Sequence, residues 1–141
     1  MTPAERADAL ARAVPSGTAI AVNGITPTWA EDGVARAEML VGQRHLNQVG
    51  VVQGGIYALF ADATAGFAAF SVVKPGKIFV TLDIRVNLLR AVSPGTRLVA
   101  EAKPVHLGGT TLVFAVTVYP EGAASKPTAF FVCTQLVVDA A

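Results

Sequence analysis

The sequence predicts an α+β domain in which an antiparallel sheet of about six strands wraps around one long central helix, with a short helix at the N-terminus. Positions 51–73 carry Asp62 as their only charged residue, which indicates a buried helix. Strict alternation of apolar and polar residues over positions 78–88 indicates a long strand, and further alternating segments follow it. The chain has 141 residues, 52% of them hydrophobic, so we expect a single domain over residues 1–141 with one core.

The N-terminal segment predicts a short surface helix followed by a hairpin. Thr2 and Glu5 match a capping box with Pro3 at the first helical position, and we expect the helix to end at Pro15. Residues 20–40 predict two extended segments joined near Asp32-Gly33, because Asp-Gly is a strong hairpin signal. Residues 41–50 predict a loop.

On length and apolarity alone, positions 51–73 are also compatible with a transmembrane helix. We favour a helix buried in protein, because the segment has a Gly-Gly pair near its start, a central carboxylate and many alanines. Such a helix needs neighbours on nearly all of its sides.

Four strands are predicted after this helix, in meander order. In the first, the apolar residues at even positions from Ile78 to Leu88 share one face, and Thr81 lies on the polar face. Turns at 93–95, 108–109 and 121–122 separate the next three strands, the last of which spans 128–138. Pro104 has no N–H to donate to a ladder, so it predicts a bulge or a strand end.

Composition excludes several classes of partner. Eleven basic and ten acidic residues leave a net charge of +1, which favours neither nucleic acid nor a membrane surface as a partner. Only 15% of residues are charged, so we expect part of the apolar surface to meet another chain. A single cysteine and two histidines predict no disulfide and no metal site, and with the charged N-terminus they favour a cytoplasmic location.

The segment around the predicted helix start resembles one enzyme family. Asn47 is followed after a short spacer by Gln53-Gly54-Gly55, and Asp62 lies seven residues after the second glycine. This pattern resembles the hotdog-fold acyl-CoA thioesterases of the phenylacetyl-CoA thioesterase type, and the resemblance extends over roughly residues 20–138. It implies the hotdog fold, hydrolysis of an acyl-CoA to a carboxylic acid and free coenzyme A, and dimers that pair into tetramers. No cofactor is implied, since coenzyme A is part of the substrate.

The resemblance also implies roles for individual residues. Asp62 becomes the catalytic carboxylate, and the Gly54 backbone N–H becomes the donor to the thioester carbonyl. Asn47 helps to hold the site or the attacking water, and Thr81 falls where relatives carry a Ser or Thr that positions that water. Gln53 stands where the family has a histidine. Glutamine keeps a donor and an acceptor but does not titrate near neutral pH, so the implied role is positioning.

Helix geometry adds an expectation about assembly. The first amides of a helix are unpaired and lie at the positive end of its dipole, so the Gly54 N–H suits a developing oxyanion, and Gly55 has no side chain to block the thioester. Gly54 and Asp62 lie about 12 Å apart along one helix at ~1.5 Å per residue. One helix cannot present both groups to one thioester, so we expect a homodimer in which Asp62 faces Gly54 of a second copy.

Each of these residues also has a purely structural interpretation. The two glycines are equally typical of tight packing between a helix and a strand, and a lone Asp in a helix can bond to a strand for stability alone. Arg85 and Arg90 are candidates for the coenzyme A phosphates, and His106 with the Gly108-Gly109 turn is a candidate for a phosphate. An exposed strand face and a solvated turn are the alternatives for these residues.

The sequence therefore predicts an acyl-CoA thioesterase in which Asp62 acts as a general base or as a nucleophile. Two other functions stay open. The first is a non-catalytic acyl-CoA binding module that lost turnover when glutamine replaced the histidine. The second is another reaction of the same fold, the hydration of an enoyl thioester.

Overall fold

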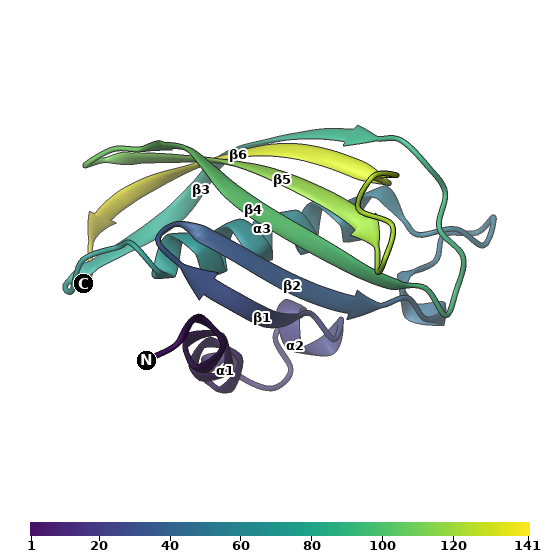
Figure 1. Ribbon diagram of the computed structural model, residues 1–141, viewed down its shortest axis with the longest axis horizontal. Coiled ribbons are helices and arrows are strands. Elements are labelled where there is room, and N and C mark those ends of the chain that lie inside the picture. Colours follow the sequence, from purple (N-terminus) through teal and green to yellow (C-terminus); the bar gives the residue numbers. More distant parts are fainter.

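The computed structural model describes residues 1–141 and has one antiparallel sheet curled over one long helix (Figure 1). The sheet order is β1-β2-β4-β5-β6-β3. The helices are α1 (Pro3–Ala13), α2 (Ala19–Val22) and α3 (Gly54–Phe70), with a 3-10 turn at Gln43–His45. The strands are β1 (Thr26–Glu31), β2 (Val34–Leu40), β3 (Lys77–Leu88), β4 (Arg97–Leu107), β5 (Thr111–Pro120) and β6 (Ala129–Asp139). The predicted α+β class, six-stranded sheet and central helix are confirmed.

The N-terminal helix covers one edge of the sheet. The Thr2–Glu5 capping box is present, and α1 ends just before Pro15 as predicted. Arg6 Nη1 donates to the carbonyl of Ala30 at 2.7 Å, which ties α1 to the edge strand β1. The extended segment expected from Ile20 is wrong over its first residues, because residues 19–22 form the short helix α2. Residues 19–22 are all apolar, and a run of four apolar residues shows neither helical nor strand periodicity, so its sequence does not distinguish a helical turn from a strand.

The hairpin between β1 and β2 turns where the Asp-Gly pair predicted it. Asp32 and Gly33 have φ angles of 50° and 81°, the left-handed conformations that a two-residue hairpin turn of this type requires.

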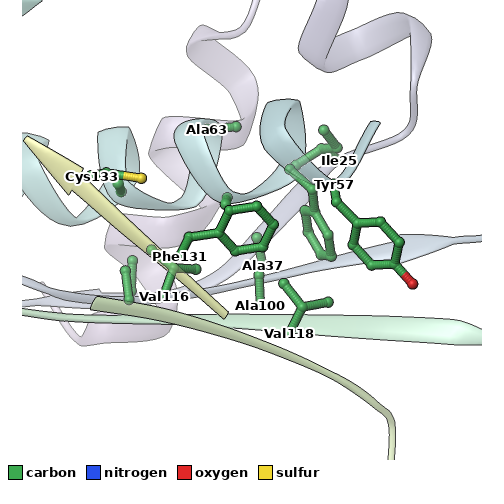
Figure 2. Packing of buried hydrophobic residues seen from close by; sticks show 14 of the residues in the cluster. Ile25, Ala37, Tyr57, Ala63, Ala100, Val116, Val118, Phe131 and Cys133 are labelled. Carbon is green, nitrogen blue, oxygen red and sulfur yellow. The ribbon is translucent and has the colours of Figure 1, made fainter. Parts of the chain in front are cut away.

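The core lies between the concave face of the sheet and α3. The helix contacts every strand, and its buried residues pack on inward-facing side chains of β2, β4, β5 and β6 (Figure 2). Phe114 and Phe131 are fully buried in this layer. One stripe of α3 stays partly open in the single chain, and it consists of Gly55, Leu59, Asp62, Gly66 and Phe70. The expectation that α3 is covered on nearly all sides therefore fails along the stripe that carries Asp62.

Strand β3 forms the second edge of the sheet, which corrects the predicted meander. It pairs with β6 rather than with β4, and residues 89–96 carry the chain back across the sheet to β4 (Figure 1). Periodicity identifies a strand but does not identify its neighbour. The outer side of β3 has no partner strand, and its large apolar residues Ile78, Val80, Leu82, Val86 and Leu88 are 41–58% exposed.

A β-bulge at Leu82 changes which side chains of β3 face the helix. Thr81 pairs with Gln135 and Asp83 pairs with Thr134, so Leu82 is the extra residue. Before the bulge the odd positions face α3, and after it the even positions do, starting at Ile84. The single apolar face predicted for the even positions is therefore wrong for Ile78 and Val80. The register between β4 and β5 also shifts directly after Pro104, which confirms the irregularity predicted at this proline.

No helix of the chain combines the length and the apolarity needed to cross a membrane.

Replacing Phe131 by alanine is expected to lower the free energy of unfolding by about 3–5 kcal/mol, because the cavity left between β6 and α3 cannot collapse. Phe130 is the matched control, since it neighbours Phe131 but is 38% exposed on the opposite face of β6. Urea unfolding of Phe131→Ala and Phe130→Ala measures both. Equal losses for the two variants would contradict the position of the core.

Candidate active site

Asp62 lies at the middle of α3, on the open stripe of the helix, and is half-buried. Its Oδ1 accepts a hydrogen bond of 2.7 Å from the Thr81 hydroxyl, across from α3 to β3. The bulge at Leu82 makes this bond possible, because it turns Thr81 toward the helix together with Ile84. Thr81 therefore lies on the face that points toward α3 rather than on the polar face predicted for it, and it stays exposed in the single chain. The bond leaves the second carboxylate oxygen of Asp62 free for chemistry.

Asp62 and Thr81 open into an apolar cavity of about 360 Å³, here called the Asp62 cavity. The remaining lining residues are Ile20, Ala63, Gly66, Phe67, Phe70, Ile78, Phe79 and Gln135. Ile20, Phe67 and Phe70 also line an adjoining groove between α3 and the N-terminal helices α1 and α2. A carboxylate at the rim of an apolar cavity is the arrangement expected where an acyl group binds beside a base.

The start of α3 lies in a different cavity. Gln53 is the N-cap residue, the Ile56 amide bonds to its carbonyl, and the amides of Gly54 and Gly55 have no partner in the chain. These free N–H groups sit at the positive end of the helix dipole. Gly54 lines a cavity of about 350 Å³ together with Asn47, Tyr57, Arg90 and residues of the 51–52 and 88–91 segments. This Gly54 cavity does not include Asp62, so one chain does not bring the two groups together.

Asn47 shapes the loop that leads into α3. Its Oδ1 accepts from the amides of Val49 at 3.0 Å and Val51 at 3.3 Å, and the Val51 carbonyl accepts from the Asn47 amide. Gly50 has a φ of 83° at the tip of this loop, a conformation that glycine adopts without strain. Asn47 thus fixes the backbone that precedes the helix while lining the Gly54 cavity.

The two histidines lie away from both cavities. His45 is fully buried, and its Nδ1 accepts from the Gly42 amide at 3.0 Å while Nε2 lies 3.0 Å from the Asn23 carbonyl. This pairing requires a neutral ring with the proton on Nε2, so His45 holds the loop. No three side chains among His, Cys, Asp and Glu gather in one place.

The other predicted site residues are scattered over the chain. Gln53 is exposed, and its side chain makes no capping bond. Arg90 lies in the Gly54 cavity, whereas Arg85 is exposed on β3, 3.5 Å from Asp83. His106 is exposed at the end of β4, and Gly108 and Gly109 line a separate cavity near Lys74. Of the predicted site residues, only Asn47 and Arg90 line the Gly54 cavity together with Gly54. Only Thr81 lines the Asp62 cavity together with Asp62.

Comparison with known proteins identifies the family. The model of the thioesterase superfamily matches residues 49–125, which include the start of α3 and Asp62. The chain belongs to the thioesterase superfamily.

Individual relatives agree with this assignment. The proofreading thioesterase EntH of Klebsiella pneumoniae is 31% identical over 104 residues, covering 74% of this chain and 75% of that protein. A relative from Archaeoglobus fulgidus is 35% identical over 88 residues, and the match spans 62% of this chain and 55% of the relative. The crystal structure of the thioesterase HI1161 of Haemophilus influenzae superposes with a TM-score of 0.85 at 26% identity, covering 94% of this chain and 90% of that one.

The resemblance to the phenylacetyl-CoA thioesterase type is also confirmed. A mutant form of the phenylacetic acid degradation protein PaaI of Thermus thermophilus superposes with a TM-score of 0.75 at 26% identity, over 83% of this chain and 96% of that one. The fold is therefore the hotdog fold, and by class the chain is a thioester hydrolase.

The single cysteine of the chain is unsuited to act as a nucleophile. Cys133 faces α3 from β6, but burial, with a contribution from the negative charges of Asp62 and Asp83, raises the pKa of its thiol to about 12. The thiol is then protonated at any pH at which a thioester survives, and a protonated thiol is a poor nucleophile.

Gln135 is a polar residue of the Asp62 cavity that was not predicted from the sequence. Gln135 lies on the inward face of β6, at the same parity as the buried residues Phe131 and Cys133. A polar residue in the apolar register of a strand was the signal that could have identified it.

Proposed function

We propose that this thioesterase hydrolyses acyl-CoA thioesters, with Asp62 of one chain and the Gly54 amide of a second chain acting on the same carbonyl. The observation that carries the proposal is the Asp62 carboxylate, held by Thr81 at the rim of an apolar cavity and half-open on an uncovered helix stripe. The acyl group occupies the Asp62 cavity, and coenzyme A lies outside it.

In the reaction, the Gly54 N–H donates to the thioester oxygen and stabilises the negative charge that develops when the carbonyl carbon is attacked. Asp62 takes a proton from the attacking water, and the C–S bond then breaks. The proton passes to the leaving sulfur, so the products are a carboxylic acid and the free thiol. Direct attack by the carboxylate, followed by hydrolysis of the resulting anhydride, uses the same two groups.

The free edge of the sheet supports a homodimer. An edge strand with unpaired backbone groups and exposed apolar side chains is a template for pairing with another chain. Packing of α1 against β1 leaves β3 as the edge without a covering element. Pairing of β3 with β3 of a second copy makes a continuous sheet and buries the exposed apolar side chains of both strands.

The proposed pairing of Asp62 with Gly54 of the second copy requires one particular register of the two β3 strands. Asp62 is bonded to Thr81, and a Cβ on Gly54 would lie 3.1 Å from Leu88 Cδ1, so the helix and the strand run in opposite directions. An antiparallel β3 pair with Thr81 opposite the partner's Leu88 therefore sets Asp62 beside the partner's Gly54. Because Leu82 is the extra residue of the bulge, this register brings Arg85 opposite Arg85 of the second copy, and the twofold axis lies between these two residues.

One basic residue beside Gly54 supports coenzyme A as the carrier. Arg90 lines the Gly54 cavity, and in the proposed mechanism the thioester sulfur and its pantetheine arm leave on this side. Its guanidinium is suited to a phosphate of coenzyme A. Apolar side chains on the outer face of the sheet, such as Val132 and Leu136, support a further pairing of dimers into tetramers.

Gln53 favours one competing function, the non-catalytic binding module. A mechanism that needs a titrating side chain at this position fails with glutamine. The present proposal assigns proton transfer to Asp62, so Gln53 acts only as a hydrogen-bonding group near the thioester.

The direct test incubates the protein with aliphatic and aromatic acyl-CoAs and measures the release of free thiol. We expect hydrolysis, and we expect Asp62→Asn to lower kcat by about a hundredfold or more, because asparagine accepts no proton. Tight binding without thiol release would support the binding module. Consumption of an enoyl-CoA with its thioester intact would support a hydratase.

The Gly54 amide is tested by Gly54→Pro with Gly54→Ala as the matched control. Proline fits the first helical position after the extended Gln53 but lacks the N–H, whereas alanine keeps it, and both add a Cβ that only the flexible end of Leu88 meets. We expect kcat to fall by about a hundredfold in the proline variant relative to the alanine variant. Equal activities in the two variants would remove the Gly54 amide from the mechanism.

The dimer register is tested by crosslinking. Arg85→Cys places two exposed thiols on either side of the proposed twofold axis, within the span that a disulfide bridges. We expect oxidation to give a covalent dimer at high yield, detected on a non-reducing gel. Asp8→Cys on α1 is the control and is expected to stay monomeric on the gel. Equal crosslinking of both variants would contradict the pairing of β3 strands.

A further inference from the structure

Gln135 is a buried polar side chain whose hydrogen-bonding groups are unused. The residue is only 1% exposed, and neither the Oε1 nor the Nε2 of its amide has a hydrogen-bond partner in the chain. Leaving a buried amide unpaired destabilises the folded chain, and a leucine of similar volume would avoid this cost. An unpaired amide therefore points to a partner outside this chain.

The position of Gln135 indicates what that partner is. It lines the Asp62 cavity and is the cross-strand neighbour of Thr81, the residue that holds Asp62. Cβ atoms of such neighbours lie about 4.5–5.5 Å apart on the same face of the sheet. Apart from Asp62, Thr81 and Gln135, the cavity is lined by apolar side chains and Gly66. An acyl group bound in the Asp62 cavity would therefore lie against Gln135 within a few bonds of its carbonyl.

We propose that Gln135 determines the acyl specificity of the enzyme by selecting thioesters that carry a hydroxyl group on the α or β carbon. A hydroxyl donates and accepts, so it can satisfy both ends of the amide at once, which an unsubstituted alkyl chain cannot do. The rest of the acyl group packs on the apolar residues Ile20, Phe67 and Phe70. This inference rests on the proposed function, since it assigns the acyl group to the Asp62 cavity.

The size of the effect follows from the same physical argument. A substrate without the hydroxyl leaves the buried amide unpaired and displaces any water that served it. Sites built to bond a substrate hydroxyl reject analogues that lack it more strongly than apolar pockets reject a missing methylene. We expect at least a tenfold preference in kcat/KM for the hydroxylated substrate.

The experiment compares hexanoyl-CoA with α-hydroxyhexanoyl-CoA and β-hydroxyhexanoyl-CoA in the wild-type enzyme and in Gln135→Leu. We expect the wild type to prefer one of the hydroxylated substrates by at least tenfold in kcat/KM. Gln135→Leu is expected to lose that preference, because kcat/KM falls more for the hydroxylated substrate than for hexanoyl-CoA. Thr134→Val, on the outer face of the same strand, is the control and keeps the wild-type preference.

A binding measurement separates this inference from the proposed function. Calorimetry with non-hydrolysable thioether analogues of the same three compounds gives their Kd values for both proteins. Hydrolysis without a preference, or equal losses of kcat/KM on all substrates in Gln135→Leu, would overturn the role of Gln135. Either result would leave the proposed thioesterase function unaffected. A tenfold difference in Kd that depends on Gln135, with no hydrolysis of any substrate, would support the role of Gln135 and overturn the proposed function.

Discussion

The rise of an α-helix keeps the two groups of the proposed mechanism, the Gly54 amide and the Asp62 carboxylate, apart from each other in this chain. The free amide at Gly54 exists because a helix starts there, and Asp62 is placed further along the same helix. They open into different cavities, so in the proposed mechanism each chain contributes two half-sites. A complete site then requires a second copy that runs in the opposite direction. In the proposed mechanism, assembly is part of catalysis for this reason.

Strand β3 connects the Asp62 half-site to the proposed dimer interface. Its inner face holds Asp62 through Thr81, and its outer side is an unpaired edge with exposed apolar residues. The bulge at Leu82 allows both, because it turns Thr81 and Ile84 to the same face of an otherwise alternating strand. A change in β3 is therefore expected to affect the carboxylate and the dimer together.

Much of the fold could be predicted from the sequence because local signals agree with one another. The capping box at Thr2 and the Asp32-Gly33 turn each rest on a few neighbouring residues, and both were found in place. Alternation located the strands, but in β3 it did not give the correct inward face before the bulge. The neighbour of β3 and the bulge were not predictable, because both depend on residues of β6 that lie far away in the sequence. The motif indicated Asp62 and Gly54, but Gln135 lies outside it, and its unpaired amide appears only once β6 is packed under α3.

The most direct measurement of the two-chain site mixes Asp62→Asn with Gly54→Pro subunits, each inactive alone, under conditions in which subunits exchange. A hybrid dimer has one site with both defects and one with neither. Since half of the dimers are hybrids at random exchange, the account predicts a return of about a quarter of the wild-type activity. Hybrid dimers seen by native mass spectrometry without any return of activity would contradict it.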